Sequence, residues 1–376
     1  MSDNEPSAVE RPPWSRPVAY LLVLAILSTA AYGAVAVLSF RFAADAPVAG
    51  RPILAVLALL GSAFVCYLLA LAIALRSAET RWLLAIIVTA SVVFRAVSLV
   101  SWPILEIDVY RYLWDGEVVW QGVSPYRYSP EQVLSGSSDG ELPGEYRRLL
   151  ELRDSNPAVH MILSRVHYGH LPTIYPPVSQ VAFAGAVALM PPRAGVLRRI
   201  VTIKAFFVVF DLATLAVVIG LLRCAGLHLG WSIAYGWCPL VIKEIANTGH
   251  LDSLAVFLTT LAIYWAVQSL RRDVRSRQRR QTLLSAVALA LAIGAKLYPI
   301  VLLPWFAAVW WRGTGWRWAM LSIAVWMALT TIVVFPMVPT DRVLAAIGVE
   351  SAGTVTREPV FELSVVSLFA KKGFLQ

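Results

Sequence analysis

The sequence predicts an all-α polytopic membrane protein, and three observations lead to this fold class. Hydrophobic residues make up 58% of the 376 residues and charged residues only 15%, which is far from the balance of a soluble domain. Several apolar runs reach the length of about 20 residues that a helix needs to cross a bilayer. Polar and charged stretches separate these runs. We therefore expect one membrane domain over residues 1–376, with roughly 8–10 transmembrane or re-entrant helices.

The net charge of +9 is unevenly placed along the chain. Residues 106–174 carry ten acidic residues against six arginines, so the basic surplus lies elsewhere. Such asymmetry is a signal of membrane topology and does not indicate nucleic-acid binding. The cysteines, Cys66, Cys224 and Cys238, lie in or beside apolar runs. They lack metal-ligand spacing and indicate no disulfide framework.

The first part of the chain is predicted to be a cytosolic tail followed by three spans. Residues 1–17 are polar, and the runs 18–40, 52–75 and 82–105 are each long enough to cross. The first run is longer than the apolar core of a secretory signal, so we expect an uncleaved anchor. Short connections then place the acidic segment 106–174 outside the cell, in agreement with the positive-inside rule.

The acidic segment 106–174 is expected to be structured. Its start is rich in Tyr and Trp, side chains that favour the headgroup region of a bilayer. Residues 135–144 have the composition of a loop tip, and 145–170 has helix-forming composition around residues 146–153. Three histidines (His160, His167 and His170) raise the question of zinc. Their spacing is unlike known ligand patterns, so solvated histidines are the favoured interpretation.

Further apolar runs follow, and their number conflicts with the charge bias. Two prolines open the short run 178–192, and the later segments are 200–222, 231–246, 253–270, 282–311, 318–336 and a short stretch at 363–370. Six arginines mark residues 271–280 as cytosolic. If every run crossed, this cluster would lie outside. The run 178–192 is the best candidate not to cross, so we expect it to be re-entrant or interfacial. The run 282–311 contains Pro299 and is either one kinked helix or a helical pair.

Eight ionisable residues lie within or beside these apolar runs: Arg95, Lys204, Asp211, Lys243, Glu244, His250, Asp252 and Lys296. Charges at membrane depth are costly, and they usually line a cavity or pair with each other. Pairing of Lys204 with Asp211, or of Lys243 with a nearby carboxylate, is one interpretation. As a set they indicate a polar cavity near the outer leaflet, because Asp108, His250 and Asp252 flank predicted outer ends.

The stretch from Glu106 to Gly116 holds the strongest candidates for chemistry. On a helix, Asp108, Arg111, Tyr112 and Asp115 fall at i, i+3, i+4 and i+7 and share one face. The structural alternative is a solvated helix whose Arg111 neutralises both aspartates. An outward-facing carboxylate beside a lipid-accessible polar cavity suits sugar transfer from a lipid phosphate. Asp can take the proton of an acceptor hydroxyl, and a cation can stabilise the departing phosphate.

These residues also resemble a family. Glu106-Ile-Asp108 looks like the acidic signature of GT-C-type integral membrane glycosyltransferases. Several motifs are similar to bacterial polyprenyl-phosphate-mannose-dependent mannosyltransferases: Asp108-x-x-Arg-Tyr-x-Trp-Asp-Gly116, Gly122-x-x-Pro-Tyr126, Tyr175-Pro-Pro177, Gly249-His-Leu-Asp252 and Lys296-x-Tyr-Pro299. They extend from about residue 106 to 304. The chain departs from the pattern at Ser124, where Asn is expected, and such enzymes usually have more spans near the C-terminus.

The resemblance implies a GT-C-like fold with a large extracytoplasmic first loop over 106–174, flanked by spans in 1–105 and 175–376. It implies a hexosyltransferase of the cell membrane, with Asp108 as the base, Glu106 and Asp115 as further catalytic candidates, and Lys296 at the donor phosphate. The remaining candidates for substrate binding are Arg111, Tyr112, Tyr126, Tyr175, His250 and Asp252. Inversion at the anomeric carbon follows from a single displacement.

The expected partners are a polyprenyl-phosphate sugar donor, a glycan or glycolipid acceptor and membrane lipid, without nucleic acid. The residues identify no particular cofactor. A divalent metal on Glu106 and Asp108 stays open, since a lipid-phosphate donor does not need one. Two alternatives compete with the transferase. A transporter or lipid flippase would also place charges at membrane depth, but we find no internal repeat. A non-catalytic assembly partner is the third interpretation.

Overall fold

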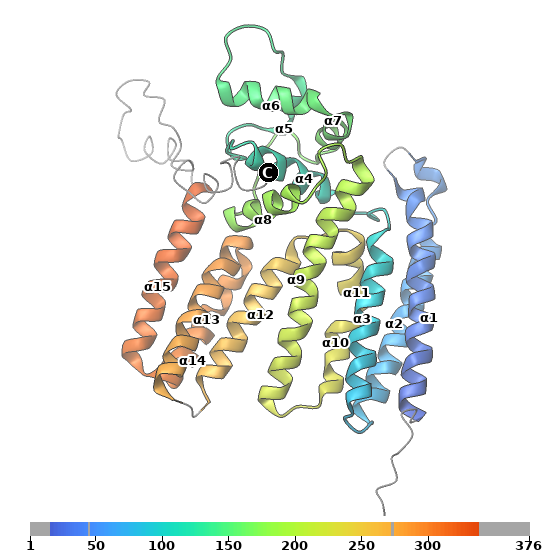
Figure 1. Ribbon diagram of the computed structural model, residues 1–376, viewed down its shortest axis with the longest axis vertical. Helices are drawn as coiled ribbons and strands as arrows, with labels where there is room; N and C mark the ends of the chain where they lie inside the picture. Colours follow the sequence, from blue (N-terminus) through green and yellow to red (C-terminus); the bar gives the residue numbers. More distant parts are fainter. Residues whose placement is uncertain (1–15, 44–45, 272–273, 338–376) are drawn as a thin grey trace, which may run out of the picture.

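The computed structural model describes residues 16–43, 46–271 and 274–337, and this part of the chain is helical and contains no strand. Most of the predicted tail 1–17 and the short apolar stretch at 363–370 lie outside the described residues. The long helices stand side by side, and a group of shorter helices covers one end of them (Figure 1). The prediction of an all-α polytopic membrane protein is confirmed.

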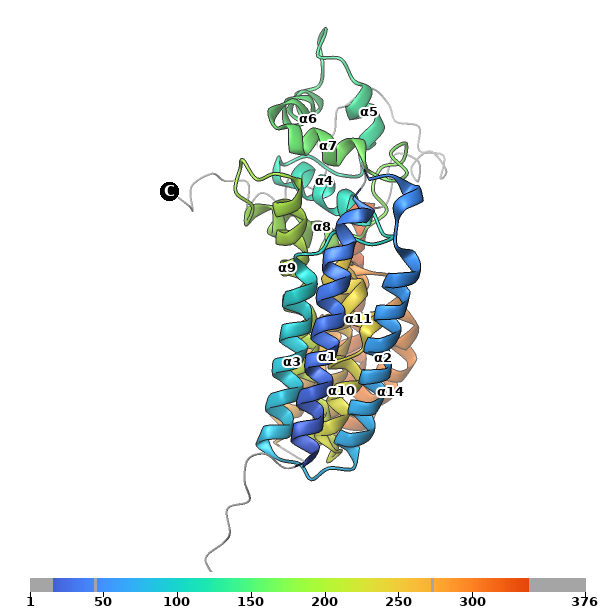
Figure 2. The same ribbon diagram turned by 90° about the vertical axis from the view of Figure 1, so that its right-hand side faces the viewer.

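Three antiparallel helices form the first part of the bundle (Figure 2). They are α1 (Arg16–Ser39), α2 (Ile53–Leu75) and α3 (Arg81–Leu99), with the short turns η1 (Phe40–Phe42) and η2 (Val48–Gly50) between α1 and α2. The third predicted span, 82–105, ends earlier as a helix, at Leu99. Pro103 disfavours helix just before it, and the last carbonyls of α3 bind a lysine from another helix, as described below.

A layer of short helices, here called the cap, follows α3. It consists of α4 (Asp108–Trp120), α5 (Pro130–Ser135), α6 (Gly144–Ser155) and α7 (Pro157–Ser164). The cap lies at one end of the bundle, the upper end in Figure 1. Local sequence sets its helix starts: Ser129 and Gln132 form a capping box ahead of α5, and Asn156 caps α7. Residues 146–153 are helical within α6, as predicted.

The short run 178–192 does not cross the bundle. It forms α8 (Pro177–Ala188), which packs against α4 at the cap end. Helix α9 (Val196–Ala225) then runs the full height of the bundle. With α8 removed from the count of crossings, the end of α12 and the start of α13 lie opposite the cap (Figure 1). The expected re-entrant or interfacial place of 178–192 thus resolves the conflict over the arginine cluster.

The next crossing is broken into short pieces. It comprises η3 (Leu229–Ser232), α10 (Ile233–Gly236), α11 (Pro239–Ile242) and the π-helical turn η4 (Lys243–Asn247). Pro239 interrupts it, because proline cannot donate the helical hydrogen bond. The chain returns to the cap end at His250, where α12 (Asp252–Ser269) begins.

The last helices pair in antiparallel fashion. Helix α13 (Arg275–Ala295) leads to the turn η5 (Tyr298–Leu302), and α14 (Leu303–Thr314) and α15 (Trp316–Val334) follow, with η6 (Phe335–Met337) at the end. The run 282–311 is therefore a helical pair, α13 and α14. Within the described residues, five helices are each long and apolar enough to cross a membrane: α1 with η1, α2, α3, α9, and α15 with η6.

A buried ion pair joins three elements in the middle of the bundle. Arg95 of α3 pairs with Asp211 of α9, and both side chains are fully buried. The hydroxyl of Tyr235 in α10 donates to Asp211 Oδ1 at 2.6 Å, and Arg95 Nη1 donates to the Gly236 carbonyl at 2.7 Å. The suggested pairing of Lys204 with Asp211 is therefore wrong. The network satisfies the hydrogen-bonding groups of both charges, as charges at this depth require.

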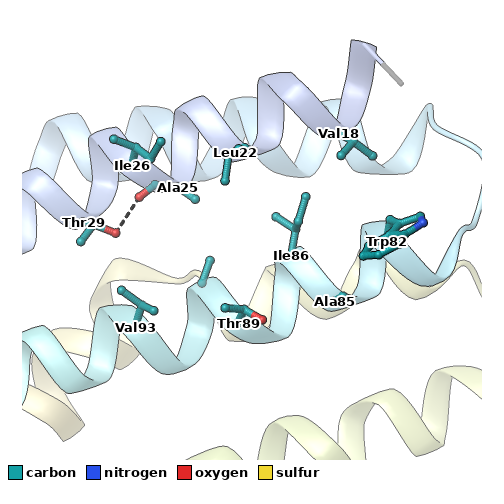
Figure 3. Close-up of a pocket in the computed structure, with 11 residues that line it drawn as sticks. Val18, Leu22, Ala25, Ile26, Thr29, Trp82, Ala85, Ile86, Thr89 and Val93 are labelled. Atoms are coloured by element: carbon teal, nitrogen blue, oxygen red, sulfur yellow. Dashed lines mark hydrogen bonds between the residues drawn. The ribbon is translucent and has the colours of Figure 1, made fainter. Parts of the chain in front are cut away.

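An apolar groove of about 490 Å³ lies between α1 and α3, away from the cap. Figure 3 shows Leu22 and Ile26 on one wall and Trp82 and Ile86 on the other. The hydroxyl of Thr29 donates to a backbone carbonyl of its own helix at 2.8 Å, so it does not make the groove polar. Such a surface is what a lipid-facing pair of helices presents.

Candidate active site

The predicted base lies in the first turn of α4. Glu106 shapes this turn, because its Oε1 accepts hydrogen bonds from the backbone N–H groups of Ile107 (3.0 Å) and Asp108 (3.3 Å). The chain enters through Leu105, whose φ of 63° is a left-handed conformation unusual for a branched residue. Strain of this kind clusters at functional sites. Glu106 therefore binds the backbone at the start of the helix that carries Asp108, and a carboxylate in a first turn is favoured by the helix dipole.

Asp108 is half-buried, and its carboxylate is held by a tyrosine. The hydroxyl of Tyr175 donates to Asp108 Oδ2 at 2.9 Å. The Tyr175 carbonyl in turn accepts the hydroxyl of Tyr126 at 2.8 Å. Burial and the neighbouring Asp108 carboxylate raise the pKa of Tyr175. Tyr175 therefore stays protonated and orients Asp108 as a hydrogen-bond donor.

The ring of Tyr112 connects the surroundings of Asp108 to the second half of the site. Its ring is fully buried and stacks on Phe183 of α8, with centroids 4.7 Å apart. It meets Tyr175 edge-on at 5.1 Å and His250 at 6.3 Å. Tyr112 thus brings α4, α8 and the turn before α12 together, which no short stretch of sequence could show.

The second half of the site is a cluster of three charged groups. Lys296 Nζ lies 2.7 Å from Asp252 Oδ1 and 2.6 Å from Asp252 Oδ2. His250 Nδ1 also pairs with the Asp252 carboxylate. Asp252 begins α12 and Lys296 follows the last residue of α13, so each charge lies at the helix end that its sign favours. All three side chains are partly exposed.

The His250 ring is biased towards its charged form. Burial lowers the pKa of His250, but the hydrogen bond and charge of Asp252 oppose burial, and the net effect is a pKa above the ordinary value. Lys296, together with His250 in its protonated form, offers positive charge to an anion.

Arg111 and Asp115 lie on the same helix as Asp108 but point into protein. Arg111 donates to the backbone carbonyls of His167, Tyr168 and Leu171 at 2.9 to 3.2 Å. Asp115 is only 2% exposed and accepts a hydrogen bond from a side-chain amide of α8 at 3.2 Å. The structural alternative, a solvated helix with Arg111 neutralising both aspartates, does not describe this arrangement.

The pKa of the Asp115 carboxyl group lies above the ordinary value for an aspartate. Burial raises its pKa to about 6, although Arg111 and the hydrogen bonds from Thr173 and Gln180 act in the opposite direction. Burial of this kind disfavours the charged form. Gln180, which was not among the predicted site residues, also donates to Thr173 Oγ1 at 3.0 Å. Its only signal in the sequence is that of a lone amide within the apolar run 178–192.

Two further residues, Lys204 and Asn247, hold the chain segment that leads from α3 to Asp108. Lys204 of α9 is fully buried and donates to the carbonyls of Leu99 (2.8 Å) and Ser101 (2.7 Å) at the end of α3. Asn247 donates to the Ser101 hydroxyl at 2.6 Å and accepts the N–H of Ile104 at 3.1 Å. Together they fix the connection between α3 and α4, and hence the position of Asp108.

Gly249 allows the backbone before α12 to pack closely against Lys204. Its φ is +76°, and an added Cβ would lie 2.8 Å from Lys204 Cγ. Glycine is therefore required there, because the backbone has a positive φ and because there is no space for a Cβ.

Among the described residues, no three His, Cys, Asp or Glu side chains form a group that could hold a metal ion. Lys243 pairs with Glu244 at 2.9 Å, as one interpretation expected.

Fold and site together define a polytopic helical membrane protein with a carboxylate and a cationic cluster at one end of its bundle. The family model for the alpha-(1→6)-mannopyranosyltransferase N-terminal domain matches residues 18–312. This match covers most of the chain, which therefore belongs to that family of mannosyltransferases. Comparison with curated proteins and with solved structures finds no match. The family favours a glycosyltransferase over the transporter and the assembly partner.

Proposed function

We propose that the protein transfers a mannosyl group from a polyprenyl-phosphate donor to a hydroxyl group of a glycan or glycolipid. The observation that carries the proposal is that Tyr112 contacts both Tyr175, which binds half-buried Asp108, and His250, which belongs to the cluster with Asp252 and Lys296. A displacement at a sugar carbon needs a base for the incoming hydroxyl group and cations for the departing phosphate, and these two groups of residues can supply them.

The proposed reaction is a single displacement. Asp108 accepts the proton of the acceptor hydroxyl as the oxygen bonds to the anomeric carbon. The bond from that carbon to the phosphate oxygen breaks at the same time, and the polyprenyl phosphate leaves with the bonding electron pair. Tyr175 holds Asp108 in the orientation for proton transfer through its hydrogen bond.

Lys296 and His250 are proposed to bind the donor phosphate. Both are cations or favour the cationic form, and both are partly exposed beside Asp252. Asp252 then serves to orient them, with its carboxylate between the two. A cation that meets the developing phosphate charge lowers the barrier more than it aids ground-state binding.

The remaining candidates are assigned to shape and positioning. Glu106 binds the backbone at the start of α4, Tyr126 supports Tyr175, and Tyr112 contacts both Tyr175 and His250. Arg111 holds α4 against the loop 167–171, and Asp115 holds it against α8.

We further propose that the cap faces the outside of the plasma membrane and that the N-terminus is cytosolic. The opposite charge bias of residues 106–174 and residues 271–280 supports this orientation. The helices of residues 106–174 and the start of α13 at Arg275 lie at opposite ends of the bundle (Figure 1). In this orientation the candidate active site opens outside the cytosol, where a lipid-linked donor is the suitable source of sugar.

The family name specifies an α-linked product, which constrains the donor. A single displacement inverts the anomeric centre, so an α product requires a donor with the opposite, β, configuration. We expect no transfer from an α-linked polyprenyl-phosphate mannose or from a nucleotide mannose. The product configuration, measured by nuclear magnetic resonance after reaction of the purified protein with each donor, checks this expectation.

Replacement of the base tests the proposal most directly. Asp108→Asn should leave the protein folded and inserted but lower turnover by about 100- to 10,000-fold, because an amide cannot accept the proton. Asp115→Asn, on the same helix but buried, is the matched control and should keep most of its activity. Activity that survives in Asp108→Asn and disappears in Asp115→Asn would overturn the assignment of the base.

A further inference from the structure

A polar pocket lies at the end of the bundle opposite the cap, where α13 begins and α14 turns into α15. It has a volume of about 320 Å³, and its lining residues are Arg275, Gln278, Arg279, Gly313, Thr314 and Gly315. The candidate active site shares none of these residues. Lys296 follows the other end of α13, a helix of 21 residues that spans roughly 30 Å.

The residues that line this pocket include two arginines and no acidic residue. Arg275, Gln278 and Arg279 fall at i, i+3 and i+4, so they share one face of α13. No acidic residue occupies the first turn of α13, although a helix start favours negative charge. Both arginines are exposed at this start. An anion in the pocket would therefore meet two guanidinium groups.

Aromatic side chains place the pocket at the level of lipid headgroups. The Arg279 guanidinium stacks over the Trp318 ring, 4.8 Å from its centroid. Trp311 and Trp316 are 65% and 61% exposed on the two sides of the turn at Gly315. Tryptophan concentrates at the boundary between the hydrocarbon core and water. The pocket thus opens where the phosphate group of a lipid lies.

We propose that this pocket binds the phosphate of an anionic phospholipid in the leaflet opposite the active site. Planar guanidinium groups match phosphate oxygens with paired hydrogen bonds. The stacking on Trp318 holds one of them in place at the boundary. A lipid, rather than a free phosphate ion, is the chosen occupant because exposed tryptophans lie on both sides of the turn at Gly315, which lines the pocket.

Lipid binding to the purified full-length protein in detergent tests the proposal. Phosphatidylglycerol, phosphatidylcholine and inorganic phosphate are added separately, and bound lipid is counted by native mass spectrometry. Arg275→Gln with Arg279→Gln should weaken phosphatidylglycerol binding by about 25-fold, since each such arginine contributes about fivefold. Arg275→Gln alone should weaken it by about fivefold, which keeps the test informative if the double variant does not fold.

The matched control removes two arginines elsewhere at the same end of the bundle. Arg76→Gln with Arg81→Gln makes the same change in net charge, and Arg81 also stacks on a tryptophan, Trp82, at 5.3 Å. This control should keep near-normal binding. Equal weakening in both pairs would show diffuse surface attraction and overturn the pocket. Equal binding of phosphatidylcholine by the unmodified protein, or competition by inorganic phosphate at the lipid's concentration, would overturn the anionic-lipid assignment.

Discussion

Lys296 is the residue whose two roles most need separating, because it pairs with Asp252 in the structure and is proposed to bind phosphate. The pair is about one-third exposed on each side, so its contribution to stability is about 1 kcal/mol or less. Lys296→Gln should therefore change the unfolding temperature little. It should lower kcat/KM for the lipid donor by about 100- to 1,000-fold, as loss of a charge-stabilising donor does.

A double-mutant cycle with Asp252→Asn distinguishes the two roles. If Lys296 served only to neutralise Asp252, removal of both charges would restore activity, since coupled residues show large interaction terms. We expect no such rescue. Lys243→Gln is the control, because Lys243 is another partly buried lysine paired with a carboxylate, at 2.9 Å from Glu244. Its replacement should leave donor kinetics near normal.

Asp115 should make stability depend on pH in a particular direction. Its pKa is about 6 in the folded protein against 3.8 for an ordinary Asp. Between these values the folded protein holds a proton that the unfolded chain has released. The contribution of Asp115 is therefore most favourable below about pH 4 and is lost as pH rises through 6. The loss amounts to roughly 3 kcal/mol, at about 1.36 kcal/mol for each pKa unit.

Asp115→Asn should remove this dependence. Compared with the unmodified protein, the variant should gain relative stability between about pH 4 and 6 and keep the gain above that range. Thermal unfolding of both proteins in detergent from about pH 4.5 to 7.5 measures it. Parallel curves over the whole range would mean that Asp115 does not hold its proton in the folded state.

The connection between α3 and α4 is the element on which the position of Asp108 depends. Asn247 satisfies the N–H of Ile104 and the carbonyl of Trp102, the latter at 3.0 Å. Asn247→Leu keeps the approximate size but leaves those buried groups unpaired, at about 1–3 kcal/mol for each. We expect a lower unfolding temperature together with a fall in kcat, because Asp108 loses its fixed position.

Asn156, the N-cap residue of α7, provides the comparison for Asn247. Asn156→Ala removes the side-chain cap of α7, where Asn156 Oδ1 accepts from the Ala158 N–H at 2.8 Å. It should cost about 1 kcal/mol and leave kcat near normal. If Asn247→Leu lowered stability but left kcat unchanged, the connection would not be what positions the base.

At the scale of the whole molecule, the two ends of the bundle should face different compartments. Ser137 lies beyond α5 in the cap region, and Ser276 lies in the first turn of α13 at the opposite end. In a variant without the native cysteines, Ser137→Cys should react with a membrane-impermeant thiol reagent in intact cells. Ser276→Cys should react only after the membrane is permeabilised. The reverse pattern would place the candidate active site in the cytosol.

Much of the fold was predictable because membrane insertion depends on local properties. The length of an apolar run and the charge of its flanks decide whether it crosses, and both are read directly from sequence. For this reason the first three long helices and the failure of 178–192 to cross the bundle were predicted correctly. The break at Pro299 was also visible, although only the structure decided between a kinked helix and a pair.

What the tertiary structure alone decided is which charge meets which. Asp211 pairs with Arg95, 116 positions away, and not with Lys204 on its own helix. Lys204 instead binds the carbonyls at the end of α3. Pairing depends on how distant helices rotate and pack against one another, and no local pattern encodes that.

By itself the sequence determined the apolar runs, their charge bias and the order of the motifs, because each of these is a property of neighbouring residues. Packing decided which of the candidate residues come together, because it brings α4 against the turn before α12 and α8 against the end of α13. It placed five of them in one site, Asp108, Tyr175, His250, Asp252 and Lys296. It turned Arg111 and Asp115 inward, where they became part of the support.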